Sequence, residues 1–129
     1  MGLLQMGSND ADRYQDAHLE LDFQRKMAAL DSSHISLTRK EYDLLSLMVR
    51  NAGEIVSRED LLMRVWGYST EIRTRTLDVH IRRLRKKLGA YSERYIETIF
   101  GVGYRFQPYR AARPLEAPRM TSGALALGA

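Results

Sequence analysis

The clearest hydrophobic pattern in the chain lies in residues 74–88. Leu77, Ile81, Leu84 and Leu88 recur every three or four positions, so a helix would gather them into one narrow apolar stripe. At about 1.5 Å per residue such a helix is roughly 22 Å long. The pattern therefore predicts a helix whose stripe packs against a core.

Two shorter amphipathic helices are predicted before this segment. The first begins at a capping box, in which Thr38 accepts a hydrogen bond from the amide of Glu41 and the Glu41 carboxylate returns one. The second has Ser57 as its N-cap and ends at Gly67. The predicted buried faces are Tyr42, Leu44, Leu45, Met48 and Val49 in the first helix, and Leu61, Leu62, Val65 and Trp66 in the second.

Alternation of apolar and polar residues predicts strands on both sides of the helices. A small antiparallel sheet is expected before the helices, and a β-hairpin after them. The hairpin turns at Gly101-Val102-Gly103, where glycines permit a positive φ. The predicted strands cover residues 19–23, 27–30, 34–37, 54–56, 95–100 and 104–106.

These elements fit one domain over residues 19–108, and a chain of 129 residues is long enough to bury a core. Residues 1–18 are largely polar and have no period, so we expect a flexible linker or lead-in, or residues left from expression. Residues 109–129 are rich in Ala, Arg and Pro, which predicts a disordered tail.

Composition excludes several classes of protein. The chain has no cysteine, so it forms no disulfide and no thiolate metal site. The three histidines lie in unrelated segments, and we expect neither a metal nor a cofactor. No apolar run reaches the roughly 18 residues of a membrane span, and no signal pattern opens the chain. We therefore expect a cytoplasmic protein with no membrane contact.

The net charge of +4 matters less than where the cations cluster. Around the single acid Asp78, the segment leading into and through the predicted helix carries Arg73, Arg75, Arg82, Arg83, Arg85, Lys86 and Lys87. A helix of this length can lie in the major groove of B-DNA, although a solvated basic face is the alternative. Asp78 precedes Arg82 by one turn, so we expect the two to pair.

Individual side chains on this helix suit particular contacts with bases. Arg83 is central on the outward face, where a guanidinium can bind guanine O6 and N7 together. Thr76 and Val79 offer methyl groups to a thymine methyl. Trp66 and Tyr104 have two interpretations, as core residues or as side chains that reach a phosphate.

Catalysis is not expected. In a helix, Asp78 and His80 point about 200° apart, and no nucleophile is placed near them. Gly101-Val102-Gly103 lacks the third glycine of a phosphate-binding loop and opens no helix, so a hairpin turn is favoured. We therefore expect a protein that is not an enzyme.

Taken together, the motifs resemble the effector domain of OmpR/PhoB-type response regulators over about residues 19–107. The resemblance implies an α+β fold, a winged helix-turn-helix with an N-terminal antiparallel four-stranded sheet, a three-helix core and a C-terminal β-hairpin wing. That sheet has one strand more than the alternation predicts. The motifs that carry the resemblance are Leu37-Thr38 through Glu41, Ser57-Arg58-Glu59-Asp60-Leu61-Leu62, Val65-Trp66-Gly67, Arg75 through Leu88, and Gly101-Val102-Gly103-Tyr104-Arg105-Phe106.

The resemblance also implies roles for residues. At the base-reading positions of the major-groove helix stand Thr76, Val79, His80 and Arg83. The candidates for phosphate binding are Trp66, Arg75, Arg82, Arg85, Thr98 and Tyr104, to which the basic helix adds Lys87. The loop that members use to contact RNA polymerase corresponds to Tyr68, Ser69, Thr70, Glu71 and Ile72.

The implied partners are double-stranded DNA, bound by two copies head to tail on direct repeats, and RNA polymerase. A sensor kinase would act only through a receiver domain, which this chain lacks, so we expect an isolated effector half or a regulator without that half. Phe100 stands where some members carry an arginine that enters the minor groove, so the resemblance does not carry minor-groove reading over to this wing. We expect Phe100 to pack against the hairpin or brace it. The alternative function is a winged-helix module that docks on an acidic protein such as RNA polymerase.

Overall fold

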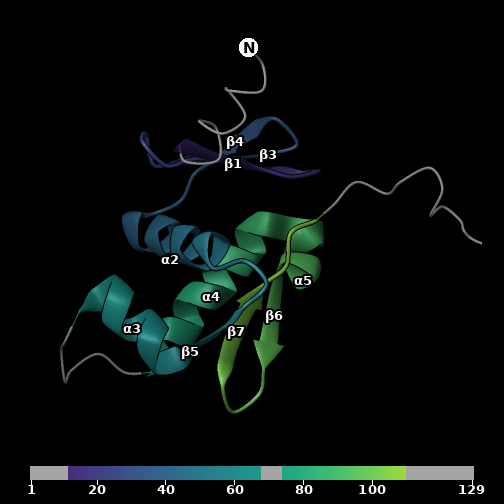
Figure 1. Ribbon diagram of the computed structural model, residues 1–129. Coiled ribbons are helices and arrows are strands. Elements are labelled where there is room, and N and C mark those ends of the chain that lie inside the picture. Colours follow the sequence, from purple (N-terminus) through teal and green to yellow (C-terminus); the bar gives the residue numbers. More distant parts are fainter. Residues whose placement is uncertain (1–11, 68–73, 110–129) are drawn as a thin grey trace, which may run out of the picture.

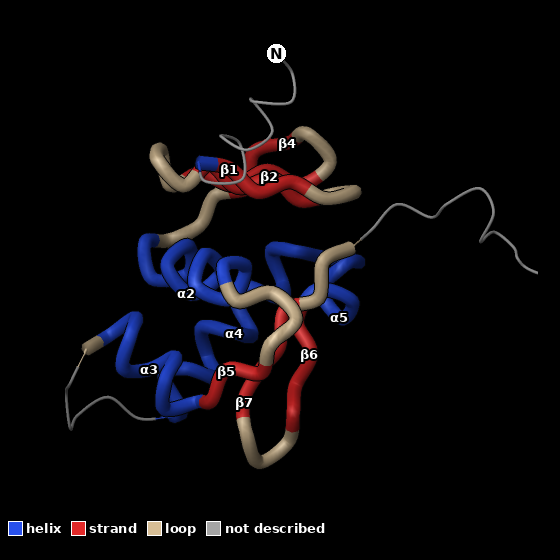
Figure 2. The backbone as a smooth tube through the Cα atoms, viewed as in Figure 1, coloured by secondary structure: helices blue, strands red, loops and turns tan. Residues whose placement is uncertain are grey.

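The protein forms a small sheet, a helical layer and a wing, stacked in that order (Figure 1). This computed structural model describes residues 12–67 and 74–109. The N-terminal sheet lies at one end of the molecule, the helices occupy the middle, and the hairpin of the wing projects at the other end (Figure 2). The predicted fold class, a winged helix with a four-stranded N-terminal sheet, is confirmed.

The N-terminal sheet is antiparallel throughout, with its strands in chain order. Asp31 and Ser32 form the turn between the last two strands, with positive φ angles of 51° and 69°. Tyr14, Leu21, Ala28 and Ile35 stand opposite one another along one row. The strands are β1 (Arg13–Gln15), β2 (Leu19–Asp22), β3 (Met27–Leu30) and β4 (Ser33–Ile35).

Strand β1 corrects the predicted domain boundary, because it lies inside residues 1–18. In this strand Tyr14 is the only apolar residue, between Arg13 and Gln15, and so short a run shows no alternation. The Tyr14 ring packs edge-on against Phe106, with the ring centroids 5.8 Å apart. The folded domain thus begins before residue 19.

The two helices with predicted N-caps begin where those caps predict, and a third helix covers the residues of the predicted apolar stripe. The Thr38 and Glu41 capping box opens α2 (Arg39–Arg50), and the Ser57 side chain accepts from the Asp60 amide to open α3 (Arg58–Trp66). The third is α4 (Thr74–Leu88). The predicted core residues of α2 are all buried, whereas in α3 Leu62 and Trp66 are only partly buried.

Two short elements after α4 were not predicted. Gly89 ends α4 with a φ of 62°, and the chain continues through the 3-10 turn η1 (Gly89–Tyr91) and α5 (Ser92–Tyr95). Tyr95 was predicted to begin a strand, but it is the last residue of α5 and is fully buried. A single helical turn has no measurable period, and an aromatic residue favours a strand in sequence.

The wing is a three-stranded sheet in the order β5-β7-β6. Gly103 stands opposite Ser57, and a side chain at Gly103 would place its Cβ 2.0 Å from the Val56 carbonyl oxygen. Only glycine therefore permits this strand pairing. The strands are β5 (Ile55–Ser57), β6 (Ile96–Ile99) and β7 (Gly103–Phe106).

Aromatic residues near the C-terminal end of the described chain bind Asp16 near its N-terminal end. Tyr95 stacks on Phe106 at 5.4 Å, and its hydroxyl donates to Asp16 at 2.5 Å. Asp16 also accepts from the backbone N–H of Tyr109 at 3.2 Å. Tyr109 was assigned to the predicted tail, so the domain extends at least to this residue. The remaining predicted tail, 110–129, lies outside the described residues.

A buried ion pair joins α2 to α4. Glu41 is 1% exposed, and its Oε1 accepts hydrogen bonds from the Thr38 backbone N–H at 3.0 Å and from Lys87 Nζ at 2.6 Å. Burial raises the pKa of the Glu41 carboxyl, but these two hydrogen bonds and the charge of Lys87 outweigh it and hold the pKa below its ordinary value of 4.5. The ionised form of Glu41 is therefore stabilised by folding.

Within residues 12–67 and 74–109, none of the helices is both long and apolar enough to cross a bilayer.

Replacing Glu41 with Gln should lower the free energy of unfolding at pH 7 by about 1 to 3 kcal/mol, since Lys87 loses its ionic partner. Because folding lowers the pKa of Glu41, its contribution is present above pH 4.5 and disappears as the pH falls through the folded-state pKa. Urea unfolding followed by circular dichroism should therefore show wild type and Glu41→Gln converging in acid.

The matched control is Glu54→Gln, which changes a carboxylate at an exposed position. It should leave the unfolding free energy unchanged at both pH values. Equal stability of Glu41→Gln and wild type at pH 7 would contradict the assignment, because it would mean that desolvation cancels the attraction within the pair.

Candidate nucleic-acid interface

The outer face of α4 is the most cationic helix face of the described structure. Its apolar stripe is buried, with Leu77, Ile81, Leu84 and Leu88 all at most 1% exposed. Opposite the stripe lie four exposed cations, and within the described ranges none of their side chains forms an ion pair or a hydrogen bond: Arg75, Arg82, Arg83 and Lys86. Four unpaired cations on one face form a surface suited to a polyanion.

Asp78 lies on the flank of α4 that faces the wing. Its Oδ1 accepts a hydrogen bond from Arg58 of α3, and a second from the Tyr104 hydroxyl of β7 at 3.0 Å. Asp78 was expected to pair with Arg82, and this expectation is wrong. Asp78 points towards α3 and the wing, whereas Arg82 is rotated further towards solvent. Arg58 was missed because nothing in a linear sequence places it beside α4.

Arg85 braces the wing from the same flank. Its Nη2 donates to the Ile96 carbonyl oxygen at 2.8 Å and to Thr98 Oγ1 at 2.7 Å. Its Nε is buried and has no hydrogen-bond partner among the described residues. The resemblance implied that Arg85 binds a phosphate, but in the structure its guanidinium points inward. Thr98 Oγ1 accepts from Arg85, so its own hydroxyl proton remains available to an outside acceptor.

Tyr104 is a core residue in this structure. It is 5% exposed, and its hydroxyl donates to Asp78. Burial raises the pKa of the Tyr104 phenol, and the hydrogen bond to Asp78 raises it further, so the phenol stays a proton donor. Of the two interpretations of Tyr104, the geometry matches the one in which it packs inside the domain.

The opposite flank of α4 carries His80 next to Trp66. His80 Nδ1 lies 2.8 Å from the Thr76 carbonyl oxygen, one turn earlier in the helix. Because a carbonyl only accepts, Nδ1 carries the proton, and Nε2 is the ring atom left for a ligand. The Trp66 ring meets the His80 ring edge-on at 4.9 Å, and Lys40 Nζ lies 5.8 Å from the Trp66 ring centroid. Trp66 is therefore partly buried between α2 and α4.

Lys87 lies on the α2 side of α4, where Glu41 binds its ammonium group. Lys87 was expected to bind a phosphate, but its ammonium group pairs with Glu41 and so joins α4 to α2. The predicted polymerase-contact loop, Tyr68, Ser69, Thr70, Glu71 and Ile72, lies outside the described residues.

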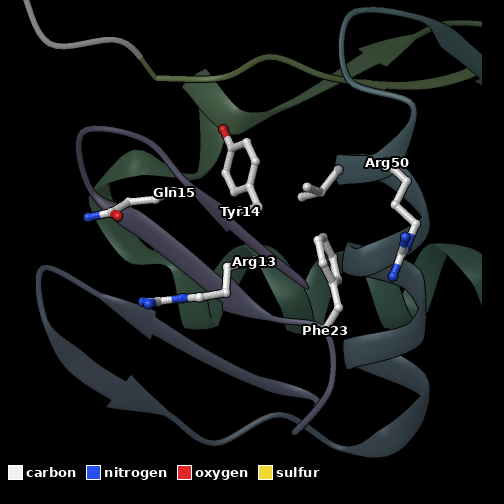
Figure 3. A pocket seen from close by; sticks show the side chains of 6 residues that line it. Arg13, Tyr14, Gln15, Phe23 and Arg50 are labelled. Atoms are coloured by element: carbon white, nitrogen blue, oxygen red, sulfur yellow. The ribbon is translucent and has the colours of Figure 1, made fainter. Parts of the chain in front are cut away.

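A pocket lies between the N-terminal sheet and the end of α2 (Figure 3). It is lined by Arg13, Tyr14, Gln15, Phe23, Val49 and Arg50. The Arg50 guanidinium packs over the Phe23 ring at 4.0 Å, and Figure 3 shows the guanidinium groups of Arg13 and Arg50 pointing away from each other. The two cations do not converge on one position, so the outer face of α4 remains the candidate interface.

Known proteins similar to this chain are regulators of transcription. The family model described as "Transcriptional regulatory protein, C terminal" matches residues 32–106. The chain is 51% identical to YclJ of Bacillus subtilis, an uncharacterized transcriptional regulatory protein, over 71 aligned residues. The alignment covers 55% of this chain and 31% of YclJ. The chain spans about a third of the length of the curated relatives it matches.

Two solved structures share the fold. The response regulator DrrB of Thermotoga maritima, an OmpR/PhoB homologue, has a TM-score of 0.69 at 31% identity, over 81% of this chain and 51% of DrrB. The RstA DNA-binding domain of Klebsiella pneumoniae, solved in complex with the RstA box, has a TM-score of 0.68 at 30% identity, over 75% of this chain and 98% of that one. The chain therefore belongs to the family of C-terminal domains of transcriptional regulatory proteins, and its winged helix is of the OmpR/PhoB type.

Proposed function

We propose that this domain binds double-stranded DNA sequence-specifically, as the effector half of a two-component response regulator. The observation that carries the proposal is the outer face of α4, where Arg75, Arg82, Arg83 and Lys86 are exposed without partners in the described structure. The other sides of α4 pack against α2, α3 and α5 and bind the wing through Asp78 and Arg85. Only this face is free to enter the major groove.

Base reading falls to the middle of this face. Arg83 is exposed and can bind guanine O6 and N7 in bidentate fashion, while Thr76 and Val79, both partly exposed, present methyl groups. His80 presents Nε2, since its Nδ1 is occupied by the Thr76 carbonyl. These four residues make a mixed surface of donors and methyl groups, which is the type of surface that discriminates between base pairs.

Phosphate binding falls to the cations around the reading residues. Arg75 and Arg82 are exposed beside them. Trp66 packs against His80 on one flank of α4, and Thr98 binds Arg85 on the other. We assign Arg85, Lys87 and Tyr104 to positioning α4, because each of them binds a group inside the domain. Phosphate contacts should supply most of the affinity, and Arg83 with its neighbours should supply the discrimination.

The proposal extends to the partners of the longer relatives. The similarity of this chain to response regulators supports three further proposals. Two copies bind head to tail on direct repeats, the loop at residues 68–72 contacts RNA polymerase, and a sensor kinase controls the protein through a receiver domain. A second candidate function is docking of the same basic face on an acidic protein, which also suits four unpaired cations.

Selection of duplexes from a random pool, followed by a salt titration of the enriched duplex, tests the proposal. A DNA-binding domain should enrich a defined sequence, and its log affinity should fall with log salt at about 0.9 per phosphate contact. An enriched pool without a common sequence would contradict sequence-specific binding. Tight binding of a polyglutamate chain in preference to the duplex would support the protein-docking function instead.

Arg83→Ala should weaken binding to the enriched duplex by about 1 to 3 kcal/mol and relax the preference at one base position. Arg75→Ala should weaken all duplexes about equally and reduce the salt slope by about one. Affinities for the enriched duplex and a scrambled duplex, measured by fluorescence anisotropy, separate the two effects.

Arg25→Ala is the matched control, since it removes an exposed arginine from the N-terminal sheet at the far end of the molecule. It should leave both affinities unchanged. If Arg83→Ala preserved the ratio of cognate to scrambled binding, base reading by Arg83 would be excluded.

Arg85→Ala should affect mainly folding stability and Arg82→Ala mainly DNA binding, although both remove an arginine from α4. Arg85→Ala should lower the free energy of unfolding by about 1 to 3 kcal/mol, because its two hydrogen bonds to the wing are lost. Arg82→Ala should change stability by less than about 0.5 kcal/mol and should weaken DNA binding. A stable Arg85→Ala protein with a reduced salt slope would instead identify Arg85 as a phosphate ligand.

A further inference from the structure

Phe100 is the most exposed large apolar side chain in the described structure. It stands at the wing turn, where it is 90% exposed, and its neighbour Val102 is 47% exposed. It was expected to pack against the hairpin, and this expectation is wrong. The turn itself is well defined, since Gly101 has a φ of 80° and the Val102 N–H donates to the Ile99 carbonyl oxygen at 2.9 Å. Phe100 is thus held outward by an ordered turn.

Exposure alone assigns no function, because single apolar residues are common on protein surfaces. The position of the turn is more informative. Arg85, in the second half of α4, binds the Ile96 carbonyl at the base of the wing. Asp78, two turns earlier, binds Tyr104, which stands opposite Thr98 and is therefore nearer the tip than Ile96. The wing therefore runs along α4 towards the beginning of that helix.

The turn between β6 and β7 lies at the end of the molecule where α4 begins (Figure 1). The Arg58 N–H donates to the Val102 carbonyl oxygen at 3.1 Å, which fixes the turn beside the start of α3. The wing tip thus projects next to the early turns of α4, on the flank that Asp78 occupies.

Two of the free cations lie between the reading face and the wing. By helical geometry, Arg75 and Arg82 lie between the outermost direction of α4 and its Asp78 flank. When α4 lies in the major groove, these two arginines contact the sugar-phosphate strand that borders it on the wing side. The next groove across that strand is the minor groove, about 6 Å wide, and a wing tip on that side of α4 would face it.

We propose that Phe100 acts as an apolar wedge that enters this minor groove, partly unstacks one base step and bends the duplex. The inference rests on the proposed function, which it deepens by adding a second source of specificity. A phenyl ring has no group that reads the hydrogen-bonding edges of bases, so the wing would read deformability. Flexible pyrimidine-purine steps such as TA and CA should be preferred at the wedge.

A protein surface is the other conceivable occupant of the wing tip. In the turn only Val102 accompanies Phe100 as an exposed large apolar residue. A stable protein interface buries about 1,200 Å² or more in total, which two neighbouring side chains do not supply. The two free arginines on the wing side of α4 favour a polyanion, and a minor groove admits a single wedge-shaped side chain.

The test uses the full chain and the duplex enriched from the random pool. A 2-aminopurine base is placed at each step of that duplex in turn to report unstacking, and fluorophores at the two ends report bending. Wild type should raise the 2-aminopurine signal at one step on the wing side and bring the ends closer together. Phe100→Ala should abolish both signals and weaken binding roughly tenfold, the scale of one large apolar contact.

Two further variants make the test specific. Phe100→Leu keeps an apolar wedge and should retain most of both signals. Met27→Ala removes a side chain that is 44% exposed on the N-terminal sheet, and should change nothing. Replacing the unstacked step with one from a stiff A-tract should weaken wild type but leave Phe100→Ala unaffected.

The two proposals fail in different ways. If wild type binds no duplex at any salt concentration, the proposed function itself fails. If wild type binds with a sequence preference while Phe100→Ala bends and unstacks the duplex as wild type does, only the wedge is overturned. A Phe100→Ala protein with normal binding to one site, but without cooperative binding of a second copy, would assign the wing tip to a protein contact and overturn the wedge as well.

Discussion

Burial of the apolar stripe of α4 determines which of its side chains can meet a ligand. Leu77, Ile81, Leu84 and Leu88 are almost completely removed from water, and each contributes about 1.5 to 3 kcal/mol relative to an exposed position. Rotating α4 about its axis by one residue would expose part of this stripe and bury cations in its place. The rotation of the helix is therefore set by the core, and the outward position of Arg83 follows from packing on the other side.

Polar contacts on the two flanks hold the helix in the same orientation. Asp78 binds Arg58 and Tyr104 on the wing side, and Lys87 binds Glu41 on the α2 side. These contacts divide the charged residues of α4 into two groups. Some stabilise the domain, and the others remain without partners in the described structure. A basic helix is therefore not uniformly a nucleic-acid ligand, and the count of its cations overstates the number available to phosphates.

The sequence predicted the elements that carry a long period or a local cap, which are α2, α3, α4 and most of the wing. It did not predict β1 or α5, because three or four residues are too few to show a period. Tyr14 is partly buried and Tyr95 fully buried, and both pack against Phe106, which lies in another element. The outward cations of α4 followed from helical geometry alone. The inward roles of Arg85, Lys87 and Tyr104 depend on which elements pack beside α4, and no local pattern contains that information.

The segregation of charge along the chain also bears on how the domain would approach DNA. Residues 12–35, which contain the N-terminal sheet, carry five carboxylates and three cations, whereas residues 74–88 carry six cations and one carboxylate. The two regions lie towards opposite ends of the molecule, since the sheet is at the far end from the wing and the start of α4 (Figure 1). A polyanion would attract one end and repel the other, so the charge distribution would orient the reading face before contact. Long-range charge would then orient the domain before binding, and core packing would set which side chains of α4 meet the bases in the complex.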